Sequence, residues 1–118
     1  MKGSGGNERR RFPRVRQPFE ARYRLFGDLA ATWCAVTAIN LSASGVRFRG
    51  EDTLKPGTML DMQIILPGIT QPAVLRGTVV WSVLQASGVI ETGVEFTNLG
   101  MLQQQQVDQL VQFLLRPR

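Results

Sequence analysis

The sequence predicts an all-β domain that ends in a single α-helix, and three observations indicate this fold class. Short apolar stretches alternate with turn residues along most of the chain, at intervals of about 8–12 residues that are typical of barrels and sandwiches. Only the C-terminal segment has apolar residues at helical spacing. The length of 118 residues corresponds to one domain, long enough to bury a core without disulfide bonds or a metal.

Six segments are expected to form strands. Residues 19–26 alternate apolar and polar side chains, and the pair Gly27-Asp28 that follows indicates a turn. The second segment is rich in β-branched and aromatic residues and leads into a polar turn, and further turns contain Pro and Gly. The five later strands are predicted at 32–41, 46–49, 58–66, 73–84 and 89–96.

The C-terminal segment 101–115 is predicted to be an amphipathic helix. Its apolar residues recur three or four positions apart, and the glutamine run within it is compatible with a helix. Asn98 is expected to cap the start of this helix. The repeating apolar residues are Val107, Leu110, Val111 and Leu114.

The positive charge is concentrated at the N-terminus. Residues 1–24 hold eight basic and two acidic side chains, so their net charge is +6, whereas the rest of the chain carries −1. Pro13 and Pro18 disfavour a helix here, so we expect an extended arm. A flexible leader is expected over 1–8, and a single domain that begins with the arm is expected over 9–118. Such a block of charge is typical of a site for an anion, or of a solvated tail that aids solubility.

Enzymatic chemistry is poorly represented in this sequence. The chain has no His, which is the commonest general base, and its lone Cys34 lacks the residues that would make it a nucleophile or a zinc ligand. We expect Cys34 to be a small residue within a strand, and its isolation favours a reducing compartment such as the cytoplasm. Glu91 and Glu95 are interpreted as surface residues. No signal peptide, transmembrane segment, metal site or cofactor motif is expected.

Two short polar segments offer binding chemistry instead. Four arginines, Arg9, Arg10, Arg11 and Arg14, lie within six positions of the arm. The guanidinium group matches phosphate oxygens bidentately, reads the O6/N7 edge of guanine and stacks on bases.

The second segment is the turn that starts at Asn40. Asn40 and Ser42 place short donors and acceptors near the backbone, and Gly45 allows a positive φ or the close approach of a ligand. By itself this pattern also fits an ordinary turn that satisfies its own backbone.

Together the two segments resemble the signature of the PilZ domain family. Arg10-x-x-x-Arg14 matches its first element, and Asn40-x-Ser42-x-x-Gly45 matches its second. The resemblance extends over residues 8–115 and includes further segments at 55–58, 77–81 and 93–96.

This resemblance implies a six-stranded antiparallel β-barrel with a C-terminal helix and a flexible basic N-terminal arm that binds cyclic di-GMP. By the same resemblance, Arg10 and Arg14 would grip phosphates and guanine edges. Asn40 and Ser42 would hydrogen-bond a guanine or the adjacent phosphate, and Gly45 would shape the turn.

Three further residues take expected roles from the resemblance. Arg9 directly precedes the first motif arginine. In the family, an arginine at the position of Arg9 favours binding of an intercalated pair of ligands over binding of a single ligand. Arg11 would add to the field that attracts anions, and Trp81 would lie near the ligand or, equally, half within the core.

A non-enzymatic, stand-alone receptor that signals arm closure to an unknown partner protein is therefore expected. Two alternatives stay open: a basic barrel that binds single-stranded nucleic acid, and an interaction domain that binds no nucleotide. Attachment to an anionic membrane through residues 2–16 is disfavoured, because the arm lacks an amphipathic apolar face. Nucleic acid is disfavoured because Phe12, Trp33, Phe48, Trp81 and Phe96 are mostly spaced as core residues rather than as a stacking face.

Overall fold

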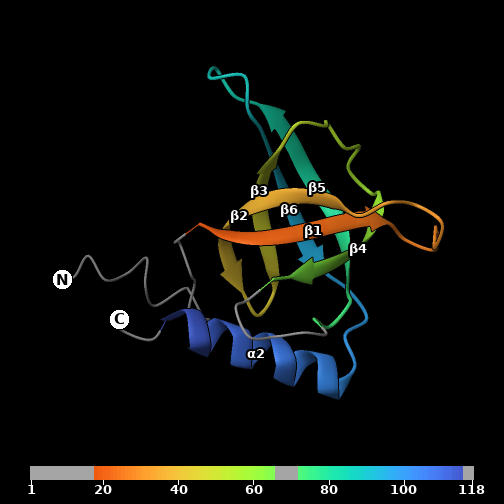
Figure 1. Cartoon of the computed structure of the whole chain (residues 1–118), viewed down its shortest axis with the longest axis vertical. Helices are drawn as coiled ribbons and strands as arrows, with labels where there is room; N and C mark the ends of the chain where they lie inside the picture. Colours follow the sequence, from red (N-terminus) through yellow and green to blue (C-terminus); the bar gives the residue numbers. More distant parts are fainter. Residues whose placement is uncertain (1–17, 66–71, 116–118) are drawn as a thin grey trace.

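The computed structural model describes residues 18–65 and 72–115. Its six strands form a closed barrel in the order β1-β2-β3-β6-β5-β4, and every neighbouring pair is antiparallel (Figure 1). One helix follows the last strand. The elements are β1 (Phe19–Leu25), β2 (Cys34–Ser42), β3 (Gly45–Gly50), β4 (Met59–Ile64), β5 (Leu75–Leu84), β6 (Ile90–Phe96) and α2 (Met101–Leu115).

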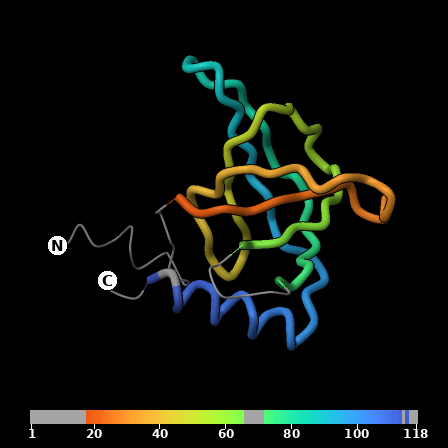
Figure 2. The backbone as a smooth tube through the Cα atoms, in the orientation of Figure 1, coloured from red at the N-terminus to blue at the C-terminus, as the bar shows by residue number. Residues whose placement is uncertain are grey.

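The predicted fold class is confirmed. Each of the six expected strands is present, with ends that differ from the expected ones by up to two residues, and the helix has the expected bounds. Because the barrel closes, no strand is left with an unpaired edge. The tip of the β5–β6 hairpin extends beyond the rest of the barrel (Figure 2).

The expected helix cap is wrong. Asn98 has a φ of 52° and lies outside the helix. Gly100 stands at the cap position instead: its carbonyl accepts the first helical bond from the Gln104 amide at 2.9 Å. The side chain of Gln103 turns back and its Oε1 accepts the Gly100 amide at 2.9 Å. This is the returning half of a capping box, in which the side chain at the third helical position accepts the amide of the cap residue. Gly100 has no side chain with which to supply the other half.

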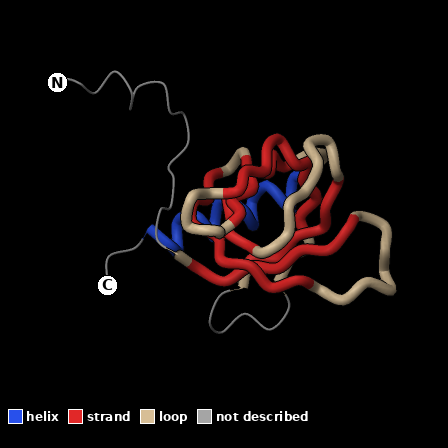
Figure 3. The backbone as a smooth tube through the Cα atoms, turned by 90° about the horizontal axis from the view of Figure 1, so that it is seen from above, coloured by secondary structure: helices blue, strands red, loops and turns tan. Residues whose placement is uncertain are grey.

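The core fills the barrel and continues under the helix. Phe48 is almost fully buried and stacks on Tyr23, with ring centroids 5.5 Å apart. Val107 and Val111 of α2 join the same cluster, and the helix lies across one end of the barrel (Figures 1 and 3). Burial, and contact with the Cys34 thiol, raise the pKa of the Tyr23 hydroxyl well above its usual value.

Trp33, one of the aromatic residues interpreted as spaced for the core, lies outside the core cluster. Trp33 packs against the side chains of Arg22 and Arg24, whose guanidinium carbons lie 5.2 and 4.3 Å from its ring centroid. Arg24 also approaches the Asp61 carboxylate at 3.6 Å. Trp81 of β5, for which a place near the ligand or half within the core was expected, also lies outside the core cluster. Among the described residues, no helix is long and apolar enough to span a bilayer.

Candidate ligand-binding site

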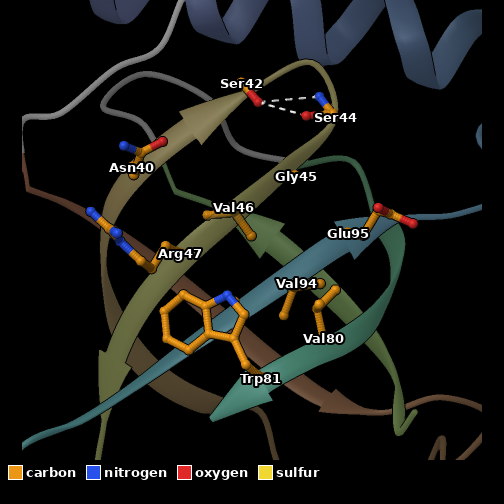
Figure 4. A pocket seen from close by; sticks show the side chains of 11 residues that line it. Asn40, Ser42, Ser44, Gly45, Val46, Arg47, Val80, Trp81, Val94 and Glu95 are labelled. Carbon is orange, nitrogen blue, oxygen red and sulfur yellow. Dashed lines mark hydrogen bonds between the residues drawn. The ribbon is translucent and has the colours of Figure 1, made fainter. Parts of the chain in front are cut away.

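A pocket of about 650 Å³ lies on the outer wall of the barrel, over the adjacent strands β2, β3, β6 and β5 (Figure 4). This volume lies within the range of about 300–1,000 Å³ that is usual for small-molecule sites. The lining includes four of the residues predicted from the sequence as ligand-binding residues, namely Asn40, Ser42, Gly45 and Trp81. The pocket is lined by Asn40, Ser42, Ser44, Gly45, Val46, Arg47, Val80, Trp81, Gly93, Val94 and Glu95.

One row of residues crosses the pocket from β2 to β5. Asn40 of β2 pairs with Arg47 of β3, which in turn pairs with Gly93 of β6. Gly93 pairs with Trp81 of β5. Paired residues in a sheet point to the same face. The amide of Asn40, the guanidinium group of Arg47 and the indole of Trp81 therefore face the pocket in one row, and Gly93, which has no side chain, stands between Arg47 and Trp81.

A β-bulge places Asn40 on this wall. Val36 and Ala38 face the core, and strict alternation would turn Asn40 inward after them. The register between β2 and β3 shifts between Ala38 and Asn40, which leaves Ile39 as the extra residue. Leu41 is therefore fully buried in the core, and Asn40 and the motif serine after it line the pocket.

A second bulge does the same for Trp81. The register between β5 and β6 shifts between Val79 and Trp81, so Val80 is the extra residue. Val80 and Trp81 both line the pocket, and Ser82 turns toward the fully buried Thr92, with the two hydroxyl oxygens 2.9 Å apart. The indole lies so close over Gly93 that an added Cβ there would be 2.5 Å from its Cε2 and Nε1 atoms.

The turn between β2 and β3 is held by hydrogen bonds of the Ser42 side chain. Ser42 is only 1% exposed, and its Oγ accepts the Ser44 amide at 3.3 Å and lies 3.0 Å from the Ser44 hydroxyl. Gly45 has no positive φ; a side chain there would instead collide with the Val94 carbonyl oxygen on β6. Glycine at this motif position is therefore required by the close approach of two strands.

Two charged residues of the lining were not predicted as site residues. Arg47 and Glu95 are both exposed and both line the pocket, whereas Glu95 was interpreted only as a surface residue. The sequence did contain a signal for Arg47, because it follows Gly45 by two positions on one strand and so faces the same side. The four predicted arm residues, Arg9, Arg10, Arg11 and Arg14, lie outside the described residues.

The structure is thus a small β-barrel with a pocket of mixed polar and apolar lining on its outer wall. A family model for the PilZ domain matches residues 8–113 of the chain. The chain therefore belongs to the PilZ domain family.

Solved structures with the same fold include several PilZ domains. The Bacillus subtilis inhibitor of motility, MotI/DgrA, matches with a TM-score of 0.69 and 18% identity, over 92% of this chain and 54% of that chain. The chain thus spans about half the length of MotI/DgrA. The PilZ domain of YcgR from Escherichia coli, solved with c-di-GMP, matches with a TM-score of 0.66 and 15% identity, over 90% of this chain and 91% of that domain. No curated protein sequence matches the chain.

Proposed function

We propose that this domain is a receptor for cyclic di-GMP and that the ligand binds in the pocket on the β2-β3-β6-β5 wall. One observation carries the proposal: the motif residues Asn40, Ser42 and Gly45, together with Trp81 from a distant strand, line a single pocket of suitable volume. Family membership supports the ligand class, as does the c-di-GMP bound in the PilZ domain of YcgR.

The chemistry of the pocket suits a guanine dinucleotide. Cyclic di-GMP offers two phosphate groups and two guanine bases. Asn40 and Ser42 bring polar side chains to the β2 side, and the indole of Trp81 offers a flat surface on which a base stacks. The tightly packed turn around Ser42 holds these groups in place before the ligand arrives, which lowers the entropic cost of binding.

The strand that follows the basic arm begins next to β2, one of the pocket strands. The arm leads into β1, and the first residue of that strand, Phe19, pairs with Ala38 of β2, two positions before Asn40. In our proposal Arg10 and Arg14 close over the ligand and bind its phosphates and guanine edges. Arg11 adds positive charge, and Arg9 favours an intercalated pair of ligands.

The arm provides the signal in this proposal. Its closure over the ligand creates a new surface that a partner protein recognises, so the domain transmits occupancy rather than catalysing a reaction. Within the described residues, no group of three or more His, Cys, Asp or Glu side chains is arranged to hold a metal ion. We place the receptor in the cytoplasm, in keeping with the lone, partly buried Cys34.

Calorimetric titration with cyclic di-GMP and with single-stranded DNA at physiological salt tests the proposal. We expect binding of the dinucleotide alone, and a loss of about tenfold or more for Arg10→Ala and Arg14→Ala, because a charged hydrogen bond contributes about 1.5–3 kcal/mol. Ser42→Ala is expected to cost less. Arg49→Ala is the matched control, since Arg49 is an arginine outside the pocket that pairs with Glu91 at 3.2 Å.

Three results would contradict parts of this proposal. A folded sample that gives no heat with cyclic di-GMP would overturn the receptor function. Binding of single-stranded DNA in its place would favour the nucleic-acid alternative. One ligand per chain would refute the role proposed for Arg9.

A further inference from the structure

The two sides of the pocket differ in chemistry. The β2 and β3 side carries hydrogen-bond donors and a cation, at Asn40, Ser42 and Arg47. The β5 and β6 side is largely apolar and ends in a carboxylate. Figure 4 shows Glu95 on the far side of the pocket from Arg47 and Asn40. The apolar residues of that second side are Val80, Trp81 and Val94.

The Glu95 carboxylate is not neutralised by the described part of the barrel. Two outward positions earlier on β6, Glu91 forms an ion pair with Arg49 at 3.2 Å. Glu95 instead pairs in register with Gly45 and Thr78, neither of which is charged. Within residues 18–65 and 72–115 it takes part in no salt bridge.

A carboxylate in a site for a dianionic ligand repels the phosphates and weakens binding, unless it accepts hydrogen bonds from the ligand. Guanine supplies such donors, because its N1–H and 2-amino groups lie side by side on the Watson–Crick edge. An ionised carboxylate is acceptor-only and has two oxygens, so it matches this edge bidentately. Glu95 stands at the next outward position of β6 after Gly93, over which the indole lies, so it borders the apolar side on which a base would stack.

We infer that Glu95 is a specificity-determining residue that reads the Watson–Crick edge of one guanine. This inference rests on the proposed function and goes further, because it assigns the discrimination between guanine and adenine. Adenine presents an acceptor at N1 where guanine presents a donor. A carboxylate facing that acceptor is repelled, so Glu95 both favours guanine and rejects adenine.

Glu95→Gln tests the inference because it should change the affinities for cyclic di-GMP and cyclic di-AMP in opposite directions. Wild type and variant are titrated with cyclic di-GMP and with cyclic di-AMP by calorimetry. We expect Glu95→Gln to weaken cyclic di-GMP binding by about tenfold or more, because a charge-assisted pair is lost. We also expect it to strengthen cyclic di-AMP binding, because a glutamine amide has the donor and acceptor that adenine requires.

Glu91→Gln is the matched control. It removes the same charge from the same face of β6 but lies outside the pocket lining, so both affinities should stay at the wild-type values. Glu95 is exposed, and an unchanged unfolding temperature would show that the variant is folded.

The outcomes separate the two proposals. If Glu95→Gln binds cyclic di-GMP as tightly as wild type, or more tightly because a repulsive charge is gone, the inference is overturned and the receptor function stands. If wild type binds no cyclic di-GMP, the receptor function and the inference both fail.

Discussion

Replacing Gly93 with alanine tests how the barrel positions Trp81. The added Cβ would lie 2.5 Å from the indole Cε2 and Nε1 atoms and 2.9 Å from Cζ2. Non-bonded carbon atoms in contact are usually about 3.5–4.0 Å apart, so the ring has to move outward by about 1 Å. The indole cannot bend to relieve the contact, and the bulge at Val80 sets the direction of the strand below it. We therefore expect the ring to tilt away from the barrel wall.

The expected loss of affinity follows from the stacking contact. Stacking of a base on an aromatic side chain contributes about 1–3 kcal/mol. Loss of this contact in Gly93→Ala would therefore raise the Kd for cyclic di-GMP by about 5- to 150-fold. Calorimetry measures the Kd, and tryptophan fluorescence in a Trp33→Phe background reports the surroundings of Trp81 alone, because the chain has only two tryptophans.

A double-mutant cycle with Trp81→Ala identifies the cause. If Gly93 acts by positioning the indole, then Gly93→Ala adds little further loss once the indole has been removed. An equal loss with and without Trp81 would refute this reasoning. So would wild-type affinity and unchanged fluorescence in the single variant.

Two further predictions concern the stability of the barrel. Gly45→Ala places a methyl group against the Val94 carbonyl of the paired strand, and we expect denaturant unfolding to show a loss of about 1–3 kcal/mol; wild-type stability would contradict the close approach of β3 and β6. Burial raises the pKa of Tyr23, so the fold favours the neutral phenol. Stability should therefore be retained below the unfolded pKa of about 10 and fall as the pH rises above it. Tyr23→Phe removes this contribution, so its free energy of unfolding should fall less between pH 8 and pH 11 than that of the wild type. An equal fall in both proteins would show that Tyr23 is not responsible.

The sequence was sufficient to predict the elements of the fold, because the alternation of apolar residues and the turn signals are local. It was not sufficient to identify the residue that caps the helix. Asn98 is a favourable cap residue by type, but Gly100 occupies the cap position and the side chain of Gln103 returns to its amide. The position of the Gln103 side chain depends in turn on a contact that is distant in the sequence, because its Nε2 donates to the Val74 carbonyl at 3.0 Å.

The site was predictable only in part. The spacing of Asn40, Ser42 and Gly45 identified the turn, and the structure brings these residues and Trp81 to one pocket. Arg47 shares a face with Gly45 by alternation along β3, but Glu95 is unremarkable within its own strand and no local pattern links it to the motif. Their shared location depends on the pairing of β3 with β6, which sets Gly45 opposite Glu95 and Arg47 opposite Gly93. That register joins residues more than 40 positions apart, and no local pattern encodes it.

The two bulges explain why the pocket lies on this wall. Without the bulge at Ile39, alternation would place Asn40 and Ser42 in the core and Leu41 outside. Without the bulge at Val80, Trp81 would point into the barrel. Each insertion reverses the alternation partway along its strand, so even-numbered residues of β2 and odd-numbered residues of β5 face the core before the bulge and the pocket after it.

The positions of the bulges also shape the hollow. They occur on β2 and β5, the outer two of the four pocket strands, whereas the pairing of the central strands β3 and β6 has no register shift. A bulge bends its strand and increases the local twist. The regular central strands contribute Gly45 and Gly93 to the pocket, and the bulged outer strands present Asn40 and Trp81 at its two edges.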